Sequence, residues 1–186
     1  AERGASACGV STCRCHPDSG RRLAGAAAAG VTAGLDIRDL REVPQYFGEV
    51  ADRIWRAWWE PDGRTLAEVE AALRDVIARP GFPFSLVATY GDQFAGTITS
   101  ISSDIAARPA LGPCLAALWV EPGVRGQGVA GQLLETAQQR LIEQGFERVY
   151  LTAKPRLRGY YQPRGWTRIE GDIDADHLDV YVRTLR

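Results

Sequence analysis

The sequence predicts a mixed α/β (α+β) fold with a central, mostly antiparallel mixed sheet of about seven strands flanked by helices. Two strand-like runs at 84–90 (FSLVATY) and 94–103 (FAGTITSISS) are separated by a short turn containing Gly91, which indicates an antiparallel hairpin. The apolar run at 114–120 (CLAALWV) is followed by a helical pattern and a further strand-like run at 148–152, which indicates one strand–helix–strand crossover. This mixed order is not that of a doubly wound sheet.

Local signals along the chain predict the remaining elements. Thr65 and Glu68 match a capping box, and the apolar residues that follow have helical spacing. Proline and glycine punctuate the chain at 79–81, and Gly145 ends the helix of the crossover. We expect a strand at 35–38, a helical region at 43–59, helices at 65–78 and 129–144, a short helix through Tyr160 and Tyr161, and closing strands at 165–169 and 177–185.

Residues 1–34 are poor in large apolar side chains and rich in Ala, Gly and Ser. They predict a disordered or weakly structured tail that precedes a folded domain at 35–186. Cys8, Cys13 and Cys15 lie in this tail, and their spacing is not that of a zinc site, so we expect no metal. Cys114 lies in an apolar strand, which suits a reduced, cytoplasmic setting.

Charge and hydropathy exclude some classes of function. The net charge of -1 and the pI near 6.2 give no reason to expect a nucleic-acid partner. Apolar runs fall short of the roughly 18 residues that a membrane helix needs, and the N-terminal residues do not resemble a signal peptide because arginines interrupt them. We therefore expect a cytoplasmic protein without a membrane partner.

The stretch VRGQGVAGQLL at 124–134 permits two interpretations. Gly126, Gly128 and Gly131 match the G-x-G-x-x-G pattern of dinucleotide-binding proteins. That pattern needs its first glycine close to the end of the strand and an acidic residue at the end of the next strand. Here 121–125 stands between the strand and Gly126, and the next strand ends at Lys154. The dinucleotide interpretation is therefore disfavoured.

The second interpretation is a loop that binds a pyrophosphate. Glycines allow backbone N–H groups to approach an anion, and the first turn of the following helix offers unpaired N–H donors. Arg125 adds a positive charge. Together, LWVEPGVRGQGVAGQLL at 118–134 and YYQPRGW at 160–166 resemble the GNAT superfamily of acyl-CoA-dependent N-acyltransferases. The resemblance is specific over 114–166 and architectural over 35–113.

The resemblance implies an acetyl-CoA cosubstrate, no metal, and a catalytic tyrosine four residues before a Gly-aromatic pair. That tyrosine is Tyr161, which would lie near the acyl-CoA sulfur. Two features depart from the family pattern: Pro163 interrupts the short helix, and no asparagine follows the fifth strand. The residues implied to bind acetyl-CoA are Leu118, Trp119, Val120, Arg125, Gly126, Gln127, Gly128, Val129 and Ala130.

Acyl transfer to an amine needs an oxyanion donor, an acid for the thiolate and a base for the amine. A backbone N–H in 118–120 is a candidate oxyanion donor, and the phenol of Tyr161 is a candidate acid. Packing in the core is the alternative role for this tyrosine. The base stays open among Glu121, Asp104 and Glu60.

Two features are candidates for binding the acceptor amine. Trp55, Trp58 and Trp59 have helical spacing and share a face, which is more typical of a core; the resemblance places this region beside the acceptor cleft, and Trp58 and Trp59 are the candidate contacts. The acidic run at 170–176 lies in the closing hairpin and would attract a cation, although a solvated turn is its more common role.

The sequence thus predicts an N-acetyltransferase that moves the acetyl group of acetyl-CoA directly to a primary amine of a small molecule or peptide. A non-catalytic CoA-binding sensor or interaction module stays open as an alternative, and a nicotinamide-dependent oxidoreductase is less favoured. The sequence leaves a homodimer open and does not identify the acceptor.

Overall fold

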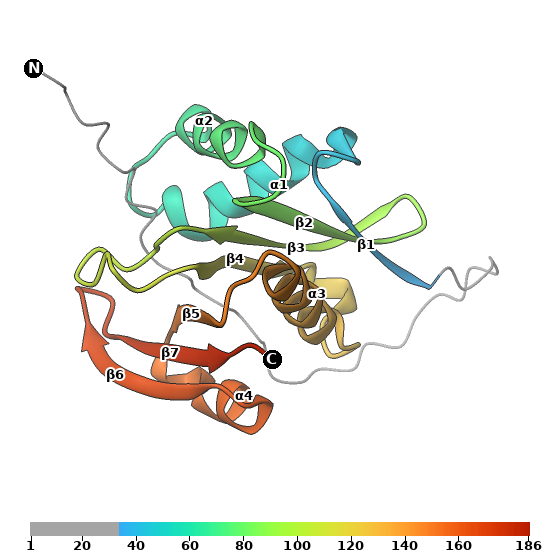
Figure 1. Cartoon of the computed structure of the whole chain (residues 1–186). Coiled ribbons are helices and arrows are strands. Elements are labelled where there is room, and N and C mark those ends of the chain that lie inside the picture. The colour runs from blue at the N-terminus through green and yellow to red at the C-terminus, as the bar shows by residue number, and fades with distance from the viewer. Residues whose placement is uncertain (1–33) are drawn as a thin grey trace, which may run out of the picture.

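The computed structural model describes residues 34–186 (Figure 1). The predicted tail, including Cys8, Cys13 and Cys15, lies outside these residues, apart from Gly34. The sheet has seven strands in the order β1-β2-β3-β4-β5-β7-β6. The strands are β1 (Leu35–Asp39), β2 (Phe84–Tyr90), β3 (Gln93–Ile101), β4 (Cys114–Val120), β5 (Arg148–Ala153), β6 (Thr167–Ile173) and β7 (Leu178–Thr184).

The pairing of the strands confirms the predicted fold class. β1 to β4 pair antiparallel in sequence order, and β7 pairs antiparallel with both β5 and β6. The contact between β4 and β5 is parallel. It is bridged by α3 (Val129–Glu143), which is the crossover helix that the sequence predicts.

The helical region predicted at 43–59 consists of three segments. A 3₁₀ turn, η1 (Pro44–Tyr46), begins with a proline and leads into α1 (Phe47–Ile54). The chain then widens into the π-helical segment η2 (Trp55–Trp59), where the Glu60 N–H donates to the Trp55 carbonyl at 2.8 Å. The wider turn allows both adjacent indoles, Trp58 and Trp59, to be buried.

The remaining helices follow their predicted signals. The capping box at the start of α2 (Leu66–Ile77) is confirmed, because the Glu68 N–H donates to Thr65 Oγ1 and the Thr65 N–H donates to Glu68 Oε2. The short helix α4 (Arg158–Tyr161) lies between two 3₁₀ turns, η4 (Pro155–Leu157) and η5 (Gln162–Arg164). Pro163 therefore ends the α-helical hydrogen bonding of this segment.

Helices cover both faces of the sheet (Figure 1). Alternate residues of β2 show the two layers, since Val87 packs with α1 and α2 whereas Leu86 and Ala88 pack with α3. Tyr161 of α4 belongs to the same core as α3. No helix among residues 34–186 is long and apolar enough to cross a membrane.

The sheet is nearly divided between β4 and β5. These strands pair only at Cys114 and Tyr150, next to a hydrogen bond from the Tyr150 N–H to the Pro113 carbonyl at 2.9 Å. Beyond Cys114 the two strands separate, although β5 continues to pair with β7 along its whole length. A gap therefore opens beside the C-terminal half of β4.

A β-bulge lies in β4 beside this gap. Thr97 pairs with Trp119 and Thr99 with Ala116, so that one residue of β3 stands opposite two residues of β4. The extra residue is Ala117, whose φ of 51° lies in the left-handed region. Because of the bulge, Ala116 and Ala117 both line the face that carries α1 and α2.

The closing hairpin differs from its prediction. We expected strands at 165–169 and 177–185 with the acidic run as the turn, but β6 begins at Thr167 and includes Glu170 and Asp172. The register of β6 against β7 shifts twice, and Asp172 has a φ of 62°. These irregularities let acidic residues occupy a strand, where the sequence pattern indicated a turn.

Candidate active site

The C-terminal half of β4 directs backbone groups into the gap. The Glu121 N–H donates to the Ala95 carbonyl of β3 at 2.9 Å. Because successive residues of a strand direct their polar backbone groups to opposite sides, the N–H of Val120 points away from β3. The Val120 carbonyl accepts a hydrogen bond from Arg125 Nε at 2.9 Å, which agrees with this direction. The Val120 N–H is therefore a candidate donor to a ligand in the gap.

A glycine cradle, formed by Gly126, Gly128 and Gly131, lies where β4 leads into α3. The turn η3 (Pro122–Val124) separates it from the strand, and Gly126 and Gly128 have φ angles of 80° and 88°. Gly128 is the N-cap of α3 and supplies no side-chain cap. A Cβ atom built on any of the three glycines would meet nothing within 4 Å. The first turn of α3 thus faces open space and can bind an anion.

The other residues of the predicted loop have different environments. Arg125 is half-buried, with its guanidinium carbon 5.1 Å from the centroid of the Trp119 ring. Gln127 is exposed and Ala130 is half-buried. Val129 is buried in the core with α3, so only its backbone is available to a ligand. The loop therefore offers a ligand the cation of Arg125, the backbone of its glycines and the polar side chain of Gln127.

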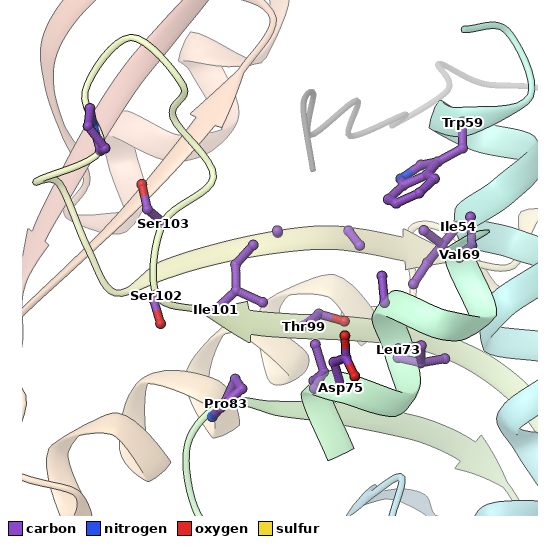
Figure 2. A pocket seen from close by; sticks show the side chains of 15 residues that line it. Ile54, Trp59, Val69, Leu73, Asp75, Pro83, Thr99, Ile101, Ser102 and Ser103 are labelled. Atoms are coloured by element: carbon purple, nitrogen blue, oxygen red, sulfur yellow. The ribbon is translucent and has the colours of Figure 1, made fainter. Parts of the chain in front are cut away.

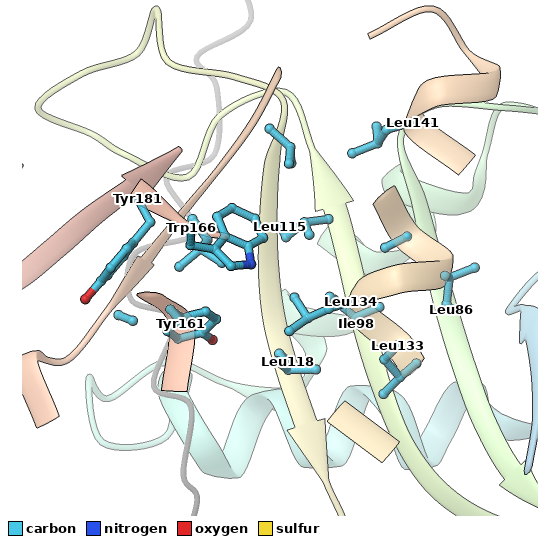
Figure 3. Close-up of a cluster of buried hydrophobic side chains, with 14 of the residues drawn as sticks. Leu86, Ile98, Leu115, Leu118, Leu133, Leu134, Leu141, Tyr161, Trp166 and Tyr181 are labelled. Atoms are coloured by element: carbon cyan, nitrogen blue, oxygen red, sulfur yellow. The ribbon is translucent and has the colours of Figure 1, made fainter. Parts of the chain in front are cut away.

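Tyr161 closes the gap on the side of α3 and α4. Its side chain is 1% exposed and packs at 5.5 Å from Tyr181 and 6.1 Å from Trp166, measured between ring centroids. It shares a core with Leu118 of β4 and Leu134 of α3 (Figure 3). The predicted tyrosine and the predicted strand are therefore brought together, in an apolar environment.

A buried ionic cluster that the sequence did not reveal fixes α4. Asp179 of β7 is 0% exposed and accepts hydrogen bonds from Arg158 at 2.6 and 3.0 Å and from Arg168 at 2.7 Å. Burial would raise the pKa of Asp179, but the two arginines lower it below its ordinary value. The only sequence signal is one acid within the apolar run of β7.

The same cluster also holds Tyr181, whose ring packs against that of Tyr161. Tyr181 OH donates to Asp179 Oδ2 at 3.3 Å. Burial, together with the negative charge of Asp179, raises the pKa of Tyr181, so this phenol stays protonated. The network joins α4, β6 and β7 and holds the aromatic residues that face β4.

On the opposite face, α1 and α2 enclose a cavity of about 490 Å³ against β3 and β4 (Figure 2). Trp59 lines this cavity, as do Ala116 and Ala117 at the bulge. These alanines lie in β4 beyond its bridge to β5, on the face of the sheet that carries α1 and α2. Trp58 is not among the lining residues; it packs edge-on against Trp119 at 6.4 Å. This placement favours Trp59 over Trp58 as a ligand contact.

The three candidate bases lie in different settings. Glu121 Oε1 accepts hydrogen bonds from Arg53 Nε at 2.5 Å and from Trp119 Nε1 at 3.3 Å. The hydrogen bond to Glu121 raises the pKa of Arg53 above its ordinary value, so this arginine stays protonated. Asp104 is buried and Glu60 is exposed. None of the three lines the cavity.

The acidic run is occupied by internal contacts. Glu170 pairs with Arg108 at 2.5 Å, Asp172 with His177 Nδ1 at 2.5 Å, and Asp176 with Lys154 at 2.7 Å. The Asp174 carboxylate accepts the Asp176 N–H at 2.9 Å. Two of the four carboxylates thus pair with a cation, Arg108 or Lys154, which weakens the case for the run as an attractor of cations.

Comparison of the sequence with known protein families identifies the family of this chain. The profile of the acetyltransferase (GNAT) domain matches residues 63–181, which is more than half of the chain. The chain belongs to the GNAT acetyltransferase family. YjgM of Escherichia coli K12, described as an uncharacterized N-acetyltransferase, is 28% identical over 158 residues, which is 80% of this chain and 85% of YjgM.

Solved acetyltransferase structures share the fold. An acetyltransferase from Streptococcus agalactiae 2603 has a TM-score of 0.62 at 17% identity, covering 82% of this chain and 99% of that protein. An aminoglycoside 6'-N-acetyltransferase complexed with coenzyme A has a TM-score of 0.63 at 16% identity, covering 81% of this chain and 97% of that protein. At this identity the likeness extends to the fold and not to the substrate.

Replacing Asp179 tests the ionic cluster. Asp179→Asn should lower the free energy of unfolding at pH 7 by roughly 3 kcal/mol, because it leaves two arginines beside a neutral buried amide. The folded-state pKa is depressed, so the stabilisation is present above the unfolded pKa of about 3.9 and is lost as the pH falls through the lower folded value.

Urea unfolding at pH 7 and at pH 3 measures this effect. The difference between the wild type and Asp179→Asn should shrink at the lower pH. Asp172→Asn is the matched control, since its side chain is 79% exposed, and it should change stability by less than about 0.5 kcal/mol. A difference for Asp179→Asn that does not depend on pH would contradict the ionic role.

Proposed function

We propose that the protein is an N-acetyltransferase that moves the acetyl group of acetyl-CoA directly to a primary amine of a small molecule or peptide. The observation that carries this proposal is the open glycine cradle at the N-terminus of α3, next to the unpaired edge of β4. The cradle suits a pyrophosphate, and the edge of β4 supplies backbone groups for an extended ligand beside it.

The residues present fit coenzyme A. Backbone N–H groups of Gly126, Gly128 and the first turn of α3 would bind the pyrophosphate, with Arg125 adding charge. Residues 118–120 would hold the pantetheine arm along the gap. A further cavity of about 400 Å³ between α3 and 163–166 continues from Gly131 and offers room for the nucleotide end.

The same residues would then assist acetyl transfer. The Val120 N–H would stabilise the negative charge that develops on the thioester oxygen as the amine nitrogen attacks the carbonyl carbon. The C–S bond breaks, and the Tyr161 phenol would donate its proton to the departing thiolate. The amine loses a proton to solvent, and the phenol regains one. We assign no protein base, because Glu121 is engaged by Arg53.

That engagement also favours a second candidate, a GNAT domain that binds coenzyme A without catalysis. Such a sensor would need the glycine cradle but neither a base nor the Tyr161 hydroxyl. The family match favours acyl transfer over nicotinamide chemistry. The cytoplasmic location and the homodimer stay predictions.

Ligand-induced stabilisation tests the cosubstrate. Acetyl-CoA should raise the melting temperature, because a ligand at 100 times its dissociation constant adds about 2.7 kcal/mol to native-state stability. NAD at the same concentration should leave it unchanged. Release of free thiol from acetyl-CoA across a panel of amines then separates the enzyme from the sensor. Stabilisation by NAD alone would refute the proposal.

Substituting the cradle tests the pyrophosphate site. Gly128→Val places a branched side chain in the open space above α3 and should raise the KM for acetyl-CoA by about 10- to 100-fold, as expected for lost hydrogen bonds to a charged group. The φ of 88° also strains the variant. Gly145→Val is the matched control at the other end of α3, where φ is 84°. It should share the loss of stability and keep the wild-type KM; equal KM values in both variants would leave the loop as a mere connection.

Removing one hydroxyl tests the acid. Tyr161→Phe keeps the ring and its packing, and it should lower kcat by roughly 10- to 1,000-fold, up to the range that general acid catalysis contributes. Binding of acetyl-CoA should change little. Tyr160→Phe serves as the control, because its ring packs against Tyr161 at 5.1 Å and has no assigned chemical role. Steady-state kinetics of both variants decide: equal, small losses would leave Tyr161 as a packing residue.

A further inference from the structure

The cavity between α1, α2 and the sheet has predominantly apolar walls. Ile54 and Trp59 contribute from the helix that ends in η2, and Val69 and Leu73 contribute from α2 (Figure 2). Ile101 of β3 and the two alanines at the bulge complete the floor. A ligand that fills such a space gains stability in proportion to the apolar surface that it buries.

The charge of the cavity is small and negative. Asp75 of α2 is the one charged side chain among its lining residues. Ser103 Oγ, in the loop between β3 and β4, is buried and has no hydrogen-bond partner. Asp75 can therefore balance one positive charge, whereas Ser103 Oγ is too deeply buried to contact a ligand.

We propose that the acceptor is a primary monoamine with an apolar body, which occupies this cavity and directs its nitrogen to the bulge at Ala116 and Ala117. The inference rests on the proposed function and specifies its acceptor. Asp75 attracts the single ammonium group as the ligand enters, and the walls select the carbon skeleton. The amine would reach the gap from the face opposite to the glycine cradle.

The same walls disfavour a polycationic acceptor. Each buried ammonium group needs a compensating acceptor, and a second or third cation would find no carboxylate in the lining. The acidic run at 170–176 does not supply one, since none of its residues lines the cavity. The similarity in fold to an aminoglycoside acetyltransferase therefore does not extend to an aminoglycoside acceptor.

A homologous series of amines tests the inference. Dissociation constants of n-propylamine to n-hexylamine are measured by calorimetry on the full chain saturated with CoA. Affinity should rise roughly fourfold per added methylene until the cavity is full. Amino alcohols of matched length and kanamycin should bind more weakly than hexylamine. With acetyl-CoA, kcat/KM should follow the same order.

Two substitutions in α2 test whether the dependence of affinity on amine chain length arises in this cavity. Ala72 lines the cavity, and Ala72→Phe fills part of it, so the dependence on chain length should flatten and the affinity for hexylamine should fall at least about tenfold. Ala71 is exposed, next to it but outside the lining, and Ala71→Phe should keep the wild-type dependence. Stabilisation by CoA should persist in both variants, which shows that each is folded.

The outcomes separate this inference from the proposed function. A flat series, or tighter binding of kanamycin than of hexylamine, would overturn the inference while leaving acetyl transfer intact. The same holds if Ala71→Phe and Ala72→Phe behave alike. A rising series without thiol release would support the cavity's selectivity and instead overturn catalysis.

Discussion

The separation of β4 from β5 is the constraint on which the rest of the molecule depends. One bridge, from Cys114 to Tyr150, joins the four-stranded and three-stranded parts of the sheet. Beyond it, the exposed edge of β4 would leave backbone groups unsatisfied unless a ligand or water bonded to them. The bulge at Ala117, the cradle before α3 and the ring of Tyr161 all lie along this edge. The candidate site thus exists because the sheet is incomplete between β4 and β5.

Much of the fold could be predicted because its signals are local. The strand-like run of β2, the capping box before α2 and the apolar run of β4 each depend on residues close in sequence, and the structure confirms them. The helix at 43–59 was less predictable, since its π-helical end depends on burying two adjacent indoles against distant strands. The limits of β6 were misjudged for a similar reason: the register shifts against β7 that accommodate Glu170 and Asp172 depend on a distant strand.

Some features of the candidate site could be predicted from local sequence patterns, and others could not. A positive φ at Gly126 and Gly128 and a bare helix start follow from glycine spacing, so the cradle was visible in the sequence. Trp58 and Trp59 were not distinguishable, because helical spacing shows a shared face but not which indole reaches a cavity. The pairing of Glu121 with Arg53 and the burial of Asp179 between two arginines join residues 68, 21 and 11 positions apart, and no local pattern encodes such contacts.

The single bridge between β4 and β5 has a mechanical consequence. Along most of their length β4 and β5 share no ladder hydrogen bonds, so these bonds do not fix the distance between the two parts of the sheet. Side-chain contacts join the two parts instead: Tyr161 and Trp166 share a core with Leu118 and Leu134, and Arg108 pairs with Glu170. Apolar contacts weaken on cooling, unlike a rigid ladder, and they tolerate small displacements. The width of the gap is therefore set by side-chain contacts between the two parts of the sheet and not by backbone pairing.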